Sequence, residues 1–380
     1  MESDIRRPAD GSSFFRKPST AGPPAPPIGS AVDSLRRSDS PSPLASPPAP
    51  PASAPRTPPP LAESSSTPAV RQPSFRGEAG TLFGIHIVNV LFTLGTLGVY
   101  YFWAKTRTRR FLFSQTEFAG DRFAYHGTGR ELLIGTLKAL LVFGVPLLAL
   151  YVIRERLDVP TAVKIAAGLV SSAVGFSFVP VAIVGARRYR LSRTSWRGVR
   201  FSFHGRTWPL MKIFIRGTLL SLVTFGFYYP VFLVRRHAFL VSQSYFGNER
   251  FDFSGQGRDL MEHFVRAVLL TPFTLGLYWF WWTARKRRYL WEHTRFGAAR
   301  FRSTVTGGAL LRLHALNALI LVGTLGLAWP WVKVRNIHFA YRYLSLLGPL
   351  DLERIQQLAQ FPSATGEALA GFFDSGFDLA

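Results

Sequence analysis

The sequence predicts an all-α membrane protein, a polytopic bundle of about six transmembrane helices built from repeats of about 50 residues. We also expect short strand-like surface segments and a disordered N-terminal tail. Three observations lead to this fold class. They are a series of long apolar stretches, an aromatic and basic phrase that closes four of them, and a second repeated phrase that lies between them.

Each apolar stretch has about 20 residues or more, which is enough for a helix to cross about 30 Å of hydrocarbon. Glycine, proline and a few charged residues interrupt the stretches, as polytopic bundles tolerate. The alternative is a large soluble helical protein, which the aromatic and basic ends of the stretches disfavour. The six stretches are 81–103, 131–151, 163–186, 210–233, 260–282 and 310–332.

The closing phrase is clearest in Thr274-Leu-Gly-Leu-Tyr278, which is followed by an aromatic run and then by Arg285–Arg288. Similar phrases begin at Thr96, Thr224 and Thr324. Apolar, aromatic and basic residues in this order match the hydrocarbon, the headgroup interface and water.

The second phrase ends in Arg-Phe-x-Phe/Tyr-x-Gly and alternates aromatic with polar residues, which predicts a short strand that ends at a glycine turn. The closing glycines fall at positions 77, 127, 205, 255 and 307, with spacings of 50, 78, 50 and 52 residues. The long unit therefore holds an extra span. Phe75-Arg-Gly77 is interpreted as a remnant of the phrase. A strand, a Gly-x-Gly and a helix also resemble a nucleotide-binding turn, but the third glycine is missing.

Composition divides the chain into three parts. Residues 1–73 hold 18 of the 27 prolines and predict a disordered tail, which either recruits a protein partner or acts as a spacer. Residues 74–348 form the repeat-built membrane domain, and 349–380 form an acidic C-terminal tail. The chain carries a net charge of +23 and has no cysteine, which excludes disulfides, thiolate metal sites and cysteine nucleophiles.

Basic residues follow the aromatic collars. A soluble nucleic-acid binder can be this basic, but here the charges lie between apolar stretches, which favours anionic lipid headgroups over nucleic acid as the partner. The alternative is a role only in topology and anchoring. The predicted headgroup contacts are Lys105, Arg107, Arg109, Arg110, Arg187, Arg188, Arg285, Lys286, Arg287 and Arg288.

Polar residues also recur inside the apolar stretches when these are aligned on their Thr-x-Gly phrases. Polar groups in a membrane are costly unless they meet each other, the backbone or water. They therefore form either a polar path through the bundle or hydrogen bonds that join helices, with snorkelling to the surface as a further alternative. The candidate residues are His86, Asn89, Arg216, His263, Arg266, His314 and Asn317.

No hydrolytic or nucleotide motif is present, because the sequence lacks GxSxG, HExxH and Walker A patterns. His126 and His204 precede closing glycines, but no carboxylate lies nearby in sequence to complete a metal site. We therefore predict no catalytic residue, no metal and no cofactor, and favour a protein that is not an enzyme.

Six spans are the simpler interpretation, but the topology that they imply has two unfavourable consequences. The loops 104–130, 187–206 and 283–309 share one side and hold 20 Lys and Arg residues, against 12 on the other side, so they are expected in the cytoplasm. That arrangement exports the N-terminal tail without a signal peptide and puts homologous strands on opposite faces. The alternative is that the Thr-x-Gly phrases turn some units into re-entrant hairpins, with all strands on one side.

The repeated phrases resemble the YjgN-like family, which are bacterial multi-pass inner-membrane proteins with a domain of unknown function. The resemblance covers roughly residues 75–380 and leaves out the proline-rich tail. It implies a location in the bacterial inner membrane and no known activity. The matching residues are Asn89, Thr96-Leu-Gly-Val-Tyr100, Trp103, Lys105, Arg107, Thr116, Phe123, Tyr125 and Gly127.

The sequence supports two functional hypotheses. The first is transport or permeation through a polar path inside the bundle. The second is a non-catalytic scaffold or anionic-lipid-interacting protein that recruits partners through its N-terminal tail.

Overall fold

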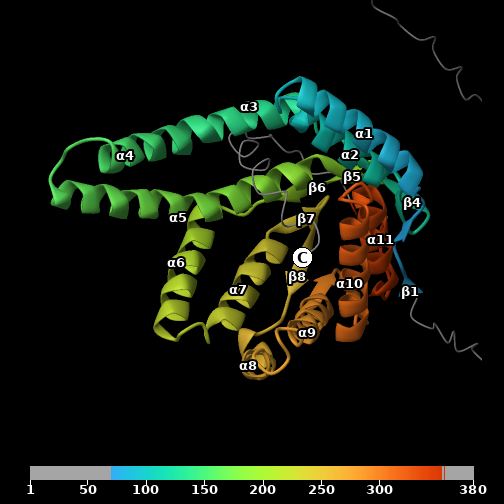
Figure 1. Cartoon of the computed structure of the whole chain (residues 1–380). Coiled ribbons are helices and arrows are strands. Elements are labelled where there is room, and N and C mark those ends of the chain that lie inside the picture. The colour runs from blue at the N-terminus through green and yellow to red at the C-terminus, as the bar shows by residue number, and fades with distance from the viewer. Residues whose placement is uncertain (1–69, 353–354, 356–380) are drawn as a thin grey trace, which may run out of the picture. The chain divides into compact units, whose positions relative to one another are not determined.

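The computed structural model describes residues 70–352 and residue 355. Eleven strands lie in this part of the chain, each two to five residues long: β1 Val70–Arg71, β2 Ser74–Phe75, β3 Thr116–Phe118, β4 Asp121–Tyr125, β5 Thr194–Trp196, β6 Val199–Phe203, β7 Ser244–Phe246, β8 Glu249–Phe253, β9 Thr294–Phe296, β10 Ala299–Ser303 and β11 Leu344–Leu347. The helices are α1 Ala79–Gly95, α2 Tyr101–Ser114, α3 Gly129–Ala139, η1 Leu140–Gly144, α4 Val145–Glu155, α5 Thr161–Ser192, α6 Thr207–Val223, α7 Tyr229–Ser242, η2 Gly257–Leu260, α8 Met261–Leu270, α9 Trp279–Glu292, α10 Gly307–Gly323 and α11 Trp329–Arg342 (Figure 1).

The strands form one antiparallel sheet whose two ends are consecutive pieces of chain. The order is β1-β11-β10-β9-β8-β7-β6-β5-β4-β3-β2. β1 pairs with β11 and β2 pairs with β3, and only Gln72 and Pro73 separate β1 from β2. Proline cannot donate to a ladder, which explains the break at this point. The sheet is therefore a ring that closes through residues 70–75, and the predicted remnant at Phe75 is its closing strand.

All strands belong to this ring, so the predicted all-α class is wrong in part and the fold is mixed. The sequence predicts the strands as short surface segments and does not predict how they pair. Each one pairs with the strand of the next repeat; for example, Phe123 lies opposite Trp196 and Phe201 lies opposite Phe246. Pairing between repeats satisfies the backbone groups that isolated strands would leave open.

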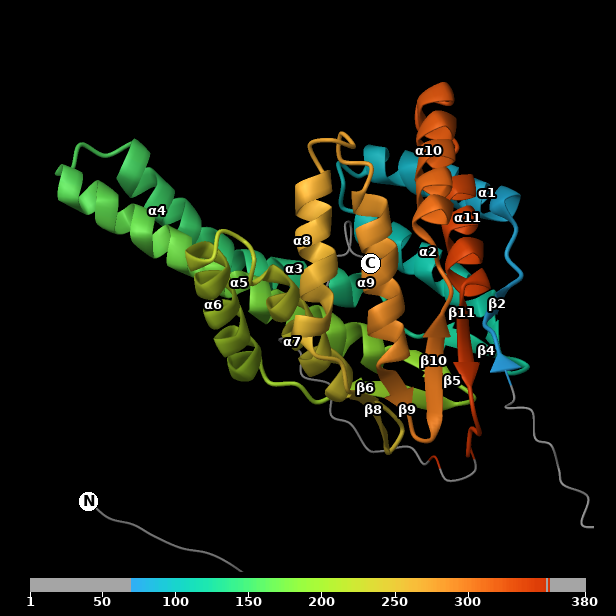
Figure 2. The ribbon, with the colours of Figure 1, turned by 90° about the horizontal axis from the view of Figure 1, so that it is seen from below.

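Four of the five helical units are short hairpins, namely α1–α2, α6–α7, α8–α9 and α10–α11, which leave the ring and return to it (Figure 2). Each turns at a Thr-x-Gly phrase. In the first, Leu97 and Gly98 both have positive φ, at 50° and 91°. The Thr96 hydroxyl donates to the Phe92 carbonyl at 2.7 Å and accepts from the Tyr100 N–H at 2.9 Å, so it joins the two helices. The other three phrases repeat these bonds.

These turns contradict the prediction of six spans. Among the described residues, two helical segments are long and apolar enough to cross a membrane: Gly129–Glu155 with 27 residues, and Thr161–Ser192 with 32. They form the long hairpin, in which α3, η1 and α4 run back along α5 (Figure 1). The other four predicted spans fail because Thr-x-Gly reverses the chain inside them. A first helix of 17 residues, such as α1, is about 25 Å long, which is less than the hydrocarbon thickness.

The helices also contact one another in a closed cycle. Each hairpin packs against the next, and the last returns to the first because α11 packs against α1. At that closure the rings of His86 and Trp329 stack at 5.1 Å, and Phe83 lies 4.9 Å from Trp331. Buried side chains such as Leu260 and Trp282 fill the space between neighbouring hairpins.

The two glycines of the Gly-x-Gly phrase allow close packing, because a side chain at either position would clash with its neighbours. A Cβ on Gly127 would lie 2.5 Å from the Tyr125 hydroxyl oxygen, and a Cβ on Gly129 would lie 2.8 Å from the Cα of Trp103. Gly307 meets Trp281 as Gly129 meets Trp103, with its Cβ position 2.7 Å from the Trp281 Cα. Gly307 is therefore the second glycine of its phrase, and Val305 occupies the closing position. With this correction the spacings after position 127 are 78, 50 and 50 residues.

Candidate ligand-binding chamber

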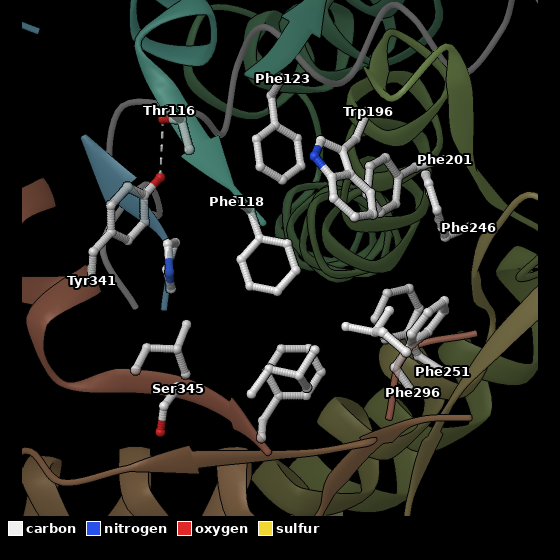
Figure 3. A pocket seen from close by; sticks show the side chains of 15 residues that line it. Thr116, Phe118, Phe123, Trp196, Phe201, Phe246, Phe251, Phe296, Tyr341 and Ser345 are labelled. Carbon is white, nitrogen blue, oxygen red and sulfur yellow. Dashed lines mark hydrogen bonds between the residues drawn. The ribbon is translucent and has the colours of Figure 1, made fainter. Parts of the chain in front are cut away.

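The strands of the ring turn their large apolar side chains inward around a cavity of about 230 Å³ (Figure 3). The odd-numbered strands from β3 onward contribute one layer, and the even-numbered strands with the β1–β2 junction contribute a second. The first layer is Phe118, Trp196, Phe246, Phe296 and Leu346, and the second is Pro73, Phe123, Phe201, Phe251 and Phe301. We call this cavity the aromatic chamber.

Repetition places these side chains. The residues of one layer occupy equivalent positions in successive repeats. Strand pairing brings the two layers together; for example, Phe251 lies opposite Phe296, with ring centroids 4.7 Å apart. The Arg-Phe-x-Phe pattern predicts strands that alternate apolar and polar faces. It does not say that the apolar faces converge, so the chamber escaped prediction. The aromatic positions that recur at 118, 196, 246 and 296 were the available signal.

The chamber wall is almost entirely apolar. Figure 3 shows the few polar groups at its edge, where Thr116 and Tyr341 share a hydrogen bond of 3.2 Å between their hydroxyls. Leu350, Leu352 and Ile355, which follow β11, pack against the same aromatic cluster. An apolar cavity of this kind suits a ligand with an apolar body.

Partly buried basic residues lie close to the chamber on the side of the helices. Arg187 of α5 donates from Nη2 to the Ser244 hydroxyl at 3.4 Å, at the start of β7. In α7, burial and the charges of Arg187 and Arg236 lower the pKa of His237 to about 4. In α9, burial and the charges of Arg287 and Arg236 lower the pKa of Lys286. We call Arg187, Arg236, His237 and Lys286 the inner basic cluster.

Equivalent positions in the repeats indicate how far part of this cluster lies from the chamber. Arg187 and His237 occupy one repeat position, and Trp291 and Tyr341 occupy the position four residues later. Tyr341 lines the chamber, and the Trp291 ring lies 5.2 Å from that of Phe301 in its wall. Residues four apart on a helix lie one above the other, about 6 Å along the axis. Arg187 and His237 are therefore about one helical turn from the chamber.

The other predicted headgroup residues have varied surroundings. Arg107 and Arg285 are exposed on their helices, and Lys105 lies over the Tyr101 ring at 5.5 Å. Two others support the closing glycines, because Arg110 donates to the Gly127 carbonyl at 3.3 Å and Arg188 donates to the Gly205 carbonyl at 2.9 Å. Arg109 is buried and donates to the Tyr125 hydroxyl at 3.4 Å, while Arg287 and Arg288 are partly buried in α9.

The two candidate asparagines join the helices of their own hairpins. Asn89 is buried and donates to the Ala104 carbonyl at 3.2 Å and to the Thr108 hydroxyl at 3.3 Å. Asn317, at the equivalent position of the last hairpin, donates to the Asn336 side chain at 2.7 Å. Thr108 and Asn336 were not predicted, because the sequence does not say which helix faces which.

The remaining candidates lie apart from one another. His86 stacks on Trp329, and the His314 ring lies 5.4 Å from Phe280 and bonds to the Leu310 carbonyl. Arg266 forms an exposed ion pair with Glu262. Arg216 lines a small cavity of about 90 Å³ between α6 and α7, and His263 lies in α8. Within residues 70–352, no hydrogen bond or ion pair joins two of the seven candidates, and their role in a polar path stays a prediction.

The two loop histidines contact the neighbouring strand. His126 Nε2 lies 2.8 Å from the Ser195 hydroxyl, and the ring of His204 lies 4.6 Å from that of Tyr245. Burial and the charges of Arg200, Arg110 and Arg193 lower the pKa of His126, which favours its neutral form. Both histidines thus help to join successive repeats.

Comparison with known proteins places these features in a family. The profile described as "Bacterial protein of unknown function (DUF898)" matches residues 71–272, 250–301 and 291–372. The inner membrane protein YjgN of Salmonella typhimurium is 31% identical over 129 residues, and YjgN of Escherichia coli O157:H7 is 32% identical over 133 residues. Each alignment covers 34% of this chain and 30% of the relative. No solved structure gives a significant match.

Proposed function

Since the chain belongs to the DUF898 family of bacterial proteins of unknown function, with distant relatives named inner membrane proteins, we propose that it is a multi-pass inner-membrane protein that binds an amphiphile in its aromatic chamber. The observation that carries this proposal is the chamber itself. Every repeat contributes apolar side chains to it, and its wall exposes almost no polar surface. Cavities of this kind take up the apolar part of a ligand.

The hairpins support a location in the membrane. Leu97, Phe225, Leu275 and Leu325, at the tips of the short hairpins, are 93% exposed or more. Such tips are costly in water but stable in hydrocarbon. The long hairpin ends differently, with charged residues between Arg154 and Asp158, which suit the aqueous phase beyond a membrane.

In the proposed topology, the long hairpin crosses the membrane twice and the short hairpins enter it without crossing. All strands and the large basic loops then lie on one side, which the positive-inside rule assigns to the cytoplasm. Residues 70 and 352, at the two ends of the continuously described chain, share that side. This is the re-entrant alternative that the sequence left open.

Native mass spectrometry of the full chain, purified in a neutral maltoside detergent, tests the proposed ligand. We expect a lipid-derived adduct on the wild type and a weaker adduct on Phe251→Trp, whose larger ring narrows the chamber. Phe251→Leu, which leaves space, is the matched control and should keep the adduct. An adduct that is equally abundant in both variants contradicts binding in the chamber.

Permeation is the second candidate, because an inner basic cluster beside an apolar constriction also resembles the vestibule and gate of an anion pathway. Anion flux into liposomes that contain the protein separates the two candidates. Flux that increases when Phe251→Leu widens the chamber favours permeation, whereas no flux with retained adduct favours binding. Recruitment of a protein by the proline-rich tail is a separate proposal, which co-purification with and without residues 1–69 tests.

A further inference from the structure

We propose that the inner basic cluster binds the anionic head group, a phosphate or a carboxylate, of the amphiphile whose apolar chain occupies the aromatic chamber. This inference rests on the proposed function and narrows its ligand to anionic amphiphiles. It gives Arg187, Arg236, His237 and Lys286 one shared role, although they come from three different hairpins.

Position is the first argument. Arg187 of α5 and His237 of α7 lie about one helical turn from the chamber, and the charge of Arg236 acts on both His237 and Lys286 of α9. Arg187 reaches Ser244, and the repeat equivalents of Ser244 include Thr116 and Leu344, which line the chamber. A ligand with its chain among the aromatic side chains therefore places its head group within reach of the cluster.

Charge balance is the second argument. Within residues 70–352, no carboxylate forms an ion pair with any of the four residues, whereas Arg193, Arg197 and Arg266 have acidic partners. Several cations held together in partly buried surroundings destabilise a fold unless an anion offsets them. The Nε of Arg187 is also buried without a hydrogen-bond partner in this part of the chain.

The residue types are the third argument. Guanidinium groups present planar forks of N–H donors that match phosphate and carboxylate oxygens, and a lysine adds a compact positive charge. Two arginines and a lysine from separate helices can surround one anionic group. The hairpin connections and the ring hold these helices in place before the ligand arrives.

The test compares two amphiphiles that share a chain and differ in the head group, dodecyl phosphate and dodecanol, with inorganic phosphate as a third probe. Adduct formation on the full chain is titrated by native mass spectrometry. We expect about tenfold tighter binding of dodecyl phosphate than of dodecanol. Lys286→Met and Arg236→Met should abolish this preference and leave the affinity for dodecanol unchanged, which also shows that the variants fold.

Arg250→Met is the matched control, because Arg250 lies on β8 beside the chamber residue Phe251 but carries an exposed side chain that pairs with Asp252. It should keep the tenfold preference. A preference that survives Lys286→Met and Arg236→Met, or that Arg250→Met removes equally, contradicts the anion site while the chamber stands. A wild type that binds neither amphiphile contradicts the proposed function itself, and inorganic phosphate that still binds would then show an anion site without a chamber ligand.

Discussion

The long hairpin and the four short hairpins share one repeat pattern, but they differ in length and in how the chain reverses. Both begin at a strand of the ring and return to its next strand. The long unit spans 78 residues where the others span 50, so it has 28 more. Where the short hairpins reverse at Thr-x-Gly, the long one has Pro146-Leu-Leu148 and continues as a helix. The comparison teaches that one turn decides whether an apolar stretch crosses a membrane or only enters it.

The largest expected effect is the loss of membrane insertion when a charge is placed inside the long hairpin. Leu141 is 67% exposed in η1, near the middle of the Gly129–Glu155 segment, so Leu141→Arg removes little packing but places a charge in hydrocarbon. The cost is about 3 kcal/mol at the centre of a span. We expect most of the variant to be lost from membranes washed with alkaline carbonate. Leu157→Arg, at the charged tip, is the control and should remain inserted.

A second effect concerns the contacts between short hairpins. A Cβ at Gly257 would lie 2.4 Å from the Cα of Val231, so Gly257→Val forces α7 and η2 apart. Overpacking of this kind costs about 1–3 kcal/mol. The thermal unfolding temperature in detergent should fall clearly. Gly308→Val is the control, since a Cβ there meets nothing within 4 Å, and equal shifts for both variants would contradict the close approach.

The smallest effect tests whether the buried asparagines hold hairpins together. Asn317 and Asn336 form a hydrogen bond of 2.7 Å, and the middle hairpins carry Ala139, Gly217 and Ala267 at the position of Asn317. A double-mutant cycle with Asn317→Ala and Asn336→Ala should give a coupling of about 1 kcal/mol. Ligand binding should persist in both variants. Lost binding in a stably folded Asn317→Ala protein would instead support the predicted polar path.

Part of this architecture could be predicted from the sequence, because the repeat carries local signals. Arg-Phe-x-Phe indicates strands, the glycines give the period, and Phe75 marks the extra copy. The four missing spans could not be predicted from hydropathy, since it sums apolarity over a window and ignores the positive φ of Leu97 and Gly98. An apolar stretch that reverses at a turn and one that crosses the membrane can therefore have the same mean hydropathy.

The sites were harder to predict than the elements. Asn89 and Asn317 were identified as polar residues at matching depth, but their partners depend on how the two helices of a hairpin face each other. The chamber depends on strands more than 40 residues apart pairing in one register, as Phe251 and Phe296 do. Lys286 was predicted to contact lipid headgroups, which stays a prediction, and the sequence did not indicate that it is partly buried in α9 with its pKa lowered by burial and by the charges of Arg287 and Arg236.

Residue-by-residue cysteine accessibility in intact cells tests the one-sided ring most directly. The chain has no native cysteine, so single substitutions at the exposed positions Ala119, Ser254 and Ala298 report the strand side, and one at Asp158 reports the tip of the long hairpin. We predict that an impermeant thiol reagent added outside labels only position 158. Labels that alternate between successive units, or no label at 158, would contradict a ring on one face with a single crossing hairpin.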